Sequence, residues 1–195
     1  MNDYMVSIVT ILLAGIFTGN MVLSKFLGIC PFLGVSKKVS TAVSMGGAVT
    51  LVMVLSTAVT WPIQTYVLTP NGLDYLQTIV FILIIAALVQ LLEILVKRFL
   101  KSLYNAFGIY LSLITTNCAV LGITLLNFTE SYDFVQSLVN ALGAGLGFLL
   151  AMFIFSGVRV RLESSKIPKS LQGLPITLVA ASLVSLSFLG FSGLI

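Results

Sequence analysis

The sequence contains no histidine and very little charge. Its 195 residues include two cysteines, 10 Lys and Arg, and 6 Asp and Glu, so that charged residues make up only 8% of the chain. Without histidine the chain cannot form a Ser-His-Asp set or an HExxH zinc site, and it also lacks a CxxC pair, a Walker loop and a GxGxxG motif. We therefore assign no catalytic residue, and we expect no catalysis by this chain alone.

The scarcity of charge also argues against a soluble domain. Hydrophobic residues make up 58% of the chain and the mean hydropathy is +1.14, whereas soluble domains contain about 25% charged residues. Several apolar runs have the length of about 20 residues that a helix needs to cross a membrane. We predict an all-α integral membrane protein. The net charge of +4 does not indicate nucleic acid, because the basic residues cluster in short segments between apolar runs.

Six apolar segments are predicted to span the membrane. Their approximate bounds are residues 4–35, 38–61, 74–96, 103–127, 132–158 and 171–193. The first segment is predicted to break near Gly28 to Pro31, because proline has no amide donor and its ring clashes with the preceding turn. The fourth is predicted to break near Thr115 to Cys118, where Thr and Asn side chains compete for backbone hydrogen bonds.

The basic residues predict the orientation of the spans. All Lys and Arg except Lys25 lie between spans one and two, three and four, or five and six. These residues are Lys37, Lys38, Lys97, Arg98, Lys101, Arg159, Arg161, Lys166 and Lys169. By the positive-inside rule these loops face the cytoplasm and both termini face outward. Interfacial aromatics are predicted at the outer surface, namely Tyr4, Trp61, Tyr66, Tyr75 and Tyr132.

The two halves of the chain repeat one another. Cys30 and Cys118 are each followed by two residues, then Leu-Gly, then a β-branched residue. Leu76-Gln77, at the start of the third span, also aligns with Leu171-Gln172, at the start of the sixth. We predict one domain with two repeats, at about residues 1–98 and 99–195. Because each repeat has three spans, the second lies inverted in the membrane, and proteins of this design carry their sites near the midplane.

Cys30 and Cys118 are the candidate ligands of such a site. A lone membrane cysteine is usually a small buried hydrophobe with an inert thiol, and a disulfide in mid-membrane has no evident purpose or oxidant. The symmetric positions of the two cysteines at helix breaks favour metal ligation. Iron–sulfur clusters normally take four thiolates, so another subunit, most simply a paralogue, would supply two. The N-termini of half-helices would offset part of the cluster's negative charge.

Lys25 lies within the first predicted span, five residues before Cys30. A cation at the centre of a membrane helix costs about 2.5–3.5 kcal/mol on insertion scales. Two interpretations stay open. The ammonium group reaches the interface along its flexible side chain, or it is a countercharge to a cluster or to an acidic group of a partner.

Three segments resemble motifs of the small membrane subunits of the Rnf and Nqr complexes. Residues 25–38 read KFLGICPFLGVSKK, residues 113–122 read LITTNCAVLG, and residues 191–193 (FSG) resemble the end of those chains. The resemblance covers essentially the whole chain. Outward termini and Lys25 favour the Rnf branch, because an apolar residue is expected at this position in the Nqr counterpart.

The resemblance implies a subunit of an ion-translocating oxidoreductase that links ferredoxin with NAD and moves Na+ or H+ across a bacterial inner membrane. It implies that Cys30 and Cys118 join two cysteines of an oppositely oriented, RnfE-like paralogue in holding a 2Fe–2S cluster. The other implied partners are the Rnf subunits B, C, D and G. Two alternatives remain, namely a secondary transporter or channel with structural cysteines and a purely structural subunit with idle thiols.

Overall fold

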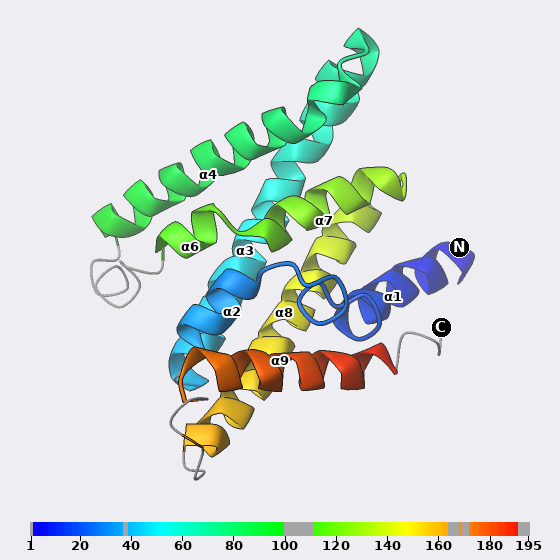
Figure 1. Cartoon of the computed structure of the whole chain (residues 1–195). Coiled ribbons are helices and arrows are strands. Elements are labelled where there is room, and N and C mark those ends of the chain that lie inside the picture. Colours follow the sequence, from blue (N-terminus) through cyan, green and yellow to red (C-terminus); the bar gives the residue numbers. More distant parts are fainter. Residues whose placement is uncertain (1, 37–38, 100–110, 164–167, 169–171, 191–195) are drawn as a thin grey trace.

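The computed structural model describes residues 2–36, 39–99, 111–163, 168 and 172–190, and the secondary structure of these residues is entirely helical (Figure 1). The all-α prediction is thus confirmed. The α-helices are α1 (Asn2–Ile16), α2 (Ile29–Val35), α3 (Val39–Ile63), α4 (Gln77–Phe99), α6 (Leu111–Thr115), α7 (Cys118–Thr129), α8 (Phe134–Glu163) and α9 (Leu174–Leu189). Shorter turns are η1 (Gln64–Leu68), η2 (Thr69–Asn71) and η3 (Asp74–Leu76).

The apolar helices follow the order of the predicted spans. Three stretches are long and apolar enough to cross a membrane, namely Val39–Asn71, Gln77–Arg98 and Phe134–Leu162. Three apolar helices of 10–17 residues are shorter, namely Tyr4–Ile16, Leu113–Thr129 and Leu174–Leu189. Two of the short helices belong to the first and fourth predicted spans, which are interrupted. The predicted ends of the sixth span, at 171 and 193, lie outside the described residues.

α3 and α8 form the central helix pair of the molecule (Figure 1). Small residues allow their close approach. A Cβ atom built on Gly46 would lie 3.1 Å from Cα of Leu149, and one built on Gly145 would lie 2.5 Å from Cγ2 of Thr50. α1 packs against α8, α7 packs against α3, and α4 contacts both α6 and α7. The two interrupted segments are therefore held against one central scaffold.

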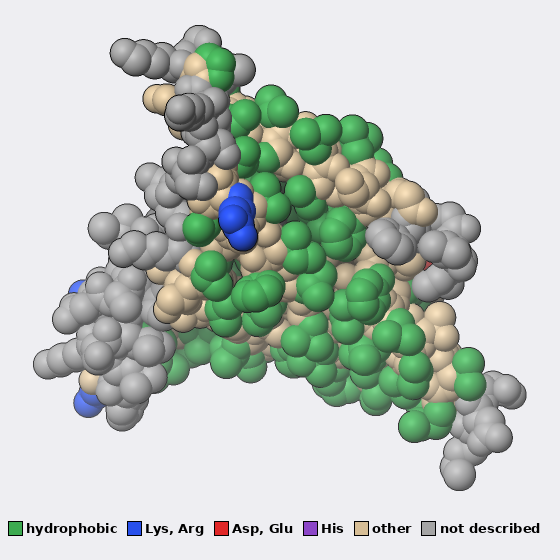
Figure 2. Space-filling view, turned by 90° about the horizontal axis from the view of Figure 1, so that it is seen from below, with side chains coloured by type: hydrophobic (Ala, Val, Ile, Leu, Met, Phe, Trp, Pro, Cys, Tyr) green, Lys and Arg blue, Asp and Glu red, His purple; other side chains and the backbone are tan. Residues whose placement is uncertain are grey.

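The molecule exposes large apolar side chains over a wide surface. Figure 2 shows one face that is mostly hydrophobic. Among the exposed residues are Leu83 and Leu91 on α4 and Leu178 and Leu186 on α9, with exposed fractions between 51% and 68%. A soluble monomer rarely exposes large contiguous apolar patches, whereas lipid covers such a surface without cost. The fold is that of a membrane protein.

The ends of α3 and α8 meet at a cluster of aromatic residues. Nε1 of Trp61 donates a hydrogen bond of 3.2 Å to the backbone carbonyl of Tyr132, and the Trp61 and Phe134 rings make an edge-on contact with centroids 5.3 Å apart. Burial, and after it the nearby Glu130 carboxylate, raises the pKa of the Tyr132 phenol above 10.0. Trp61 and Tyr132, two of the aromatics predicted to share one interface, thus lie at the same end of the molecule.

Candidate functional site at two helix breaks

The first break is wider and begins earlier than the sequence predicted. α1 ends at Ile16 and α2 begins at Ile29, so residues 17–28 connect two helices. Asn20 is fully buried in this connection. Its Oδ1 accepts hydrogen bonds from the backbone amides of Val22 at 3.1 Å and Leu23 at 3.4 Å. The Asn20 side chain thus accepts hydrogen bonds from backbone amides that a helix would otherwise pair with backbone carbonyls. The connection therefore has a defined hydrogen-bonded structure.

The Gly-x-Cys-Pro motif starts a helix instead of interrupting one, which corrects the prediction of a break between Gly28 and Pro31. Gly28 is the N-cap of α2 and has a left-handed backbone, with φ of 85°, which glycine adopts without steric cost. Cys30 and Pro31 then occupy the first turn of α2. Proline is tolerated there, because amides of the first turn have no partner within the helix.

The second break lies where it was predicted. α6 ends at Thr115 and α7 begins at Cys118. Asn117 is the N-cap, and its Oδ1 accepts a hydrogen bond of 3.0 Å from the backbone amide of Ala119. This is the usual function of an asparagine N-cap. Cys118 is therefore the first residue of its helix, as Cys30 is the second residue of α2.

The two breaks pack directly against each other. A Cβ atom built on Gly28 would lie 3.1 Å from Cβ of Ala119 and 3.3 Å from Oδ1 of Asn117. These contacts join the N-terminus of α2 to the N-terminus of α7. The two helix starts that carry the cysteines therefore lie side by side, although they are 88 positions apart in the sequence.

The glycines of the repeated Leu-Gly motif mediate the same contact. A Cβ atom built on Gly122 would lie 2.5 Å from Cδ1 of Leu27, which belongs to the first break. One built on Gly34 would lie 3.6 Å from Cδ1 of Leu113, which precedes the second break. Each motif glycine thus faces a leucine from the other half of the chain. The contact at Gly122 leaves no room for a Cβ atom, whereas the spacing at Gly34 is ordinary van der Waals contact.

Both cysteines are free and exposed. Neither is the buried small hydrophobe that a lone membrane cysteine usually is. Amides in the first turn of a helix have no intrahelical acceptor and can donate to an anion. Among the described residues, no three or more Cys, Asp or Glu side chains are grouped so as to hold a metal ion. The chain itself thus offers two soft thiolate ligands at most.

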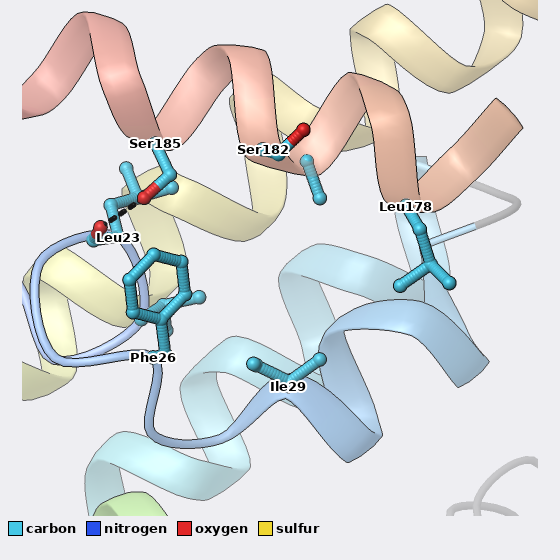
Figure 3. Close-up of a pocket in the computed structure, with 8 residues that line it drawn as sticks. Leu23, Phe26, Ile29, Leu178, Ser182 and Ser185 are labelled. Atoms are coloured by element: carbon cyan, nitrogen blue, oxygen red, sulfur yellow. Dashed lines mark hydrogen bonds between the residues drawn. The ribbon is translucent and has the colours of Figure 1, made fainter. Parts of the chain in front are cut away.

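Each break borders a cavity that a helix of the other half closes. The first cavity has a volume of about 180 Å³ and lies between Leu23, Phe26 and Ile29 of the first break and α9 (Figure 3). The second has a volume of about 250 Å³ and lies between the second break, including Asn117 and Cys118, and α4. Both are mainly apolar.

Three hydrogen bonds from distant residues fix the first break and the helix that follows it, and sequence reasoning found none of them. The Ser185 hydroxyl on α9 donates to the backbone carbonyl of Leu23 (Figure 3). Nη1 of Arg159 donates to the carbonyl of Leu33 at 2.7 Å and to Oγ of Ser36 at 2.9 Å. The prediction that Arg159 is a loop residue is wrong, because α8 continues to Glu163 and buries Arg159 against the C-terminal end of α2.

Lys25 does not lie in a helix, contrary to its predicted position in a membrane-spanning helix. It is exposed, and it belongs to the connection between α1 and α2, next to Phe26 whose φ is 57°. Within the part of the chain that the structure describes, no ion pair involves Lys25.

The chain is similar to a known family of membrane subunits. The family model described as "Rnf-Nqr subunit, membrane protein" matches residues 8–195. The A subunit of the Na(+)-translocating ferredoxin:NAD(+) oxidoreductase complex of Acetobacterium woodii is 56% identical over 188 residues, which cover 96% of this chain and 98% of that protein. The A subunit of the ion-translocating oxidoreductase complex of Syntrophotalea carbinolica is 52% identical, covering 98% and 99%. That of Aliivibrio fischeri is 45% identical, covering 95% and 96%.

Proposed function

Because the chain belongs to the Rnf-Nqr family of membrane subunits, we propose that it works within an ion-translocating complex that transfers electrons between ferredoxin and NAD. The preference for the RnfA type over its Nqr counterpart is confirmed, since the three relatives are A subunits of ion-translocating oxidoreductase complexes. The complex performs the oxidation and reduction, and this chain contributes a membrane-embedded part of the electron path. Electron transfer is coupled to translocation of Na+ or H+.

Cys30 and Cys118 supply two of the four thiolate ligands of a 2Fe–2S cluster in this proposal. The observation that carries it is the packing of the two cysteine-bearing helix starts against each other, with both thiols free and exposed. A site with two ligands on an exposed surface fits half of a four-thiolate set. The other half comes from a paralogous, RnfE-like subunit. When bound, the cluster accepts and donates single electrons.

The protein around the cysteines offsets the charge of such a group. The start of α2 has no side-chain cap, so its amides can donate hydrogen bonds to sulfur, which reduces the cost of an anion in hydrocarbon. Asn20 and Ser185 hold the first break in one conformation, and Arg159 anchors the C-terminal end of α2. A ligand set that is held rigidly before binding loses less entropy when the cluster assembles.

The proposal includes two inverted repeats of three spans each, with both termini outside and the protein in the bacterial inner membrane. Equivalent residues of α4 and α9 have similar surroundings, which supports the repeat. Leu83 and Leu178 are both exposed, and Ala86 and Ala181 line the second and first cavities respectively. α4 of the first repeat therefore borders the cavity at the second break, and α9 of the second repeat borders the cavity at the first break. This exchange is expected for two repeats related by a pseudo-two-fold axis.

Replacing each cysteine by serine tests the cluster. The change is nearly isosteric, and a serine oxygen is a harder and poorer ligand for iron. We expect Cys30→Ser and Cys118→Ser to lose or destabilise one cluster in an otherwise assembled complex, measured as iron per complex, the EPR signal of the reduced centre, and NAD reduction by ferredoxin. If both variants keep full iron and full turnover, the thiols are idle. A transporter or structural role would then remain.

A further inference from the structure

Asn117 occupies a special place in the second break. Asn117 is buried, with an exposed fraction of 4%. Together with the adjacent Cys118 it lines the cavity of about 250 Å³. Its Oδ1 is committed to the amide of Ala119 and faces Gly28. No described residue accepts a hydrogen bond from the buried Nδ2 of Asn117.

A buried amide donor without an acceptor carries a desolvation penalty. Asn117 does not need this donor to cap α7, because a side-chain oxygen is sufficient for an N-cap. Serine, threonine and aspartate also cap helices through an oxygen. The retained amide group therefore indicates an acceptor that this chain lacks. The group next to it that can carry negative charge is the Cys118 sulfur.

The first break has no corresponding donor. In the alignment of the two cysteine motifs, Ile29 takes the place of Asn117. The hydroxyls that line the first cavity have partners within the protein. Ser185 donates to the carbonyl of Leu23 (Figure 3). Oγ of Ser182 donates to the carbonyl of Val179 at 2.8 Å. Among the described residues, an unpaired buried side-chain donor beside a cysteine is thus found at the second break and not at the first.

We propose that Nδ2 of Asn117 donates a hydrogen bond to a sulfur of the cluster that Cys118 ligates, an acceptor that this chain alone does not supply. This inference rests on the proposed function. A hydrogen bond to a cluster sulfur stabilises negative charge and so favours the more negative reduced state, which raises the reduction potential. Asn117 is a positioning residue, and it makes the environments of the two cysteines unequal.

Two substitutions remove the donor and keep the cap. Asn117→Ser retains a capping oxygen without the amide group, and Asn117→Asp retains the shape and replaces the donor by an anion. We expect the purified complex to keep its iron in both variants. The midpoint potential of the cluster, measured by EPR during redox titration, should shift downward in Asn117→Ser and further downward in Asn117→Asp. Ile29→Val, at the equivalent position before Cys30, is the control and should leave the potential unchanged.

The outcomes separate this inference from the function on which it rests. If the wild-type complex has no iron signal that depends on Cys30 and Cys118, the proposed function fails. If the signal is present and Asn117→Ser leaves the potential at the wild-type value, the hydrogen bond is refuted and the cluster assignment stands. Loss of the cluster from both Asn117 variants in an assembled complex also contradicts the inference, because a tuning hydrogen bond leaves both thiolates in place.

Discussion

The side-chain amide of Asn20 donates a hydrogen bond of 2.8 Å to the backbone carbonyl of Gly147, and this bond joins the first helix break to α8. The same side chain accepts from the amides of Val22 and Leu23. One buried residue thus satisfies backbone groups that would otherwise be unpaired in the interior. The path of the chain toward Cys30 depends on it.

We predict that Asn20→Ala destabilises the protein by about 2–3 kcal/mol, because several buried polar groups lose their partners together. The measurement is the unfolding midpoint in detergent. Asn71→Ala is the matched control, since Asn71 is exposed and its Nδ2 bonds only to the carbonyl of Val67, one helical turn earlier. The control should change stability by no more than about 0.5 kcal/mol. Equal effects in the two variants would contradict a special role of Asn20.

Gly147 marks the closest approach of α1 to α8. A Cβ atom there would lie 2.7 Å from the backbone oxygen of Gly15, which cannot move aside as a side chain can. We expect Gly147→Ala to cost about 1–3 kcal/mol through overpacking. Gly157 lies on the same helix with no atom within 4 Å of its added Cβ. Gly157→Ala should therefore stabilise α8 by up to about 1 kcal/mol, and thermal unfolding of the two variants should move in opposite directions.

Arg159 places a buried cation at the C-terminal end of α2, where the helix dipole favours positive charge. Arg159→Met should cost about 1.5–3 kcal/mol, because the carbonyl of Leu33 loses a charged donor. Arg159→Lys keeps the charge and should lose less stability. Arg98→Met removes an exposed arginine in the last turn of α4 and serves as the control. If Arg159→Met and Arg98→Met unfold at the same denaturant concentration, the buried bonds contribute nothing.

The sequence predicted features that depend on neighbouring residues and missed those that depend on distant ones. The second break was found because Thr-Thr-Asn carries its own capping side chain, Asn117. The first break was misplaced because Asn20 acts with Gly147, a partner 127 positions away. Arg159 was assigned to a loop because a basic residue at the end of an apolar run usually marks an interface. Its acceptors, Leu33 and Ser36, lie in the other half of the chain.

The orientation of the chain stays a prediction that reporter fusions can test. The basic residues place the segment around Lys101 in the cytoplasm and the C-terminus outside. Reporters fused after Lys101 and after Ile195 should therefore give opposite signals, with a phosphatase active only at the second site. Matching signals would contradict both the orientation and the inversion of the repeats, because an odd number of spans must separate the two positions.

Lys25 provides the last test of the proposed site. It is exposed beside the connection that leads to Cys30, and no described residue neutralises it with an ion pair. If Lys25 is a countercharge, Lys25→Met should lower the reduction potential of the cluster, because removing a cation disfavours the more negative reduced state. Lys25→Arg keeps the charge and should leave the potential close to the wild-type value. The measurement is a redox titration of the complex, followed by EPR. An unchanged potential in Lys25→Met, with normal cluster assembly, would mean that the ammonium group lies at the interface and has no electrostatic role at the site.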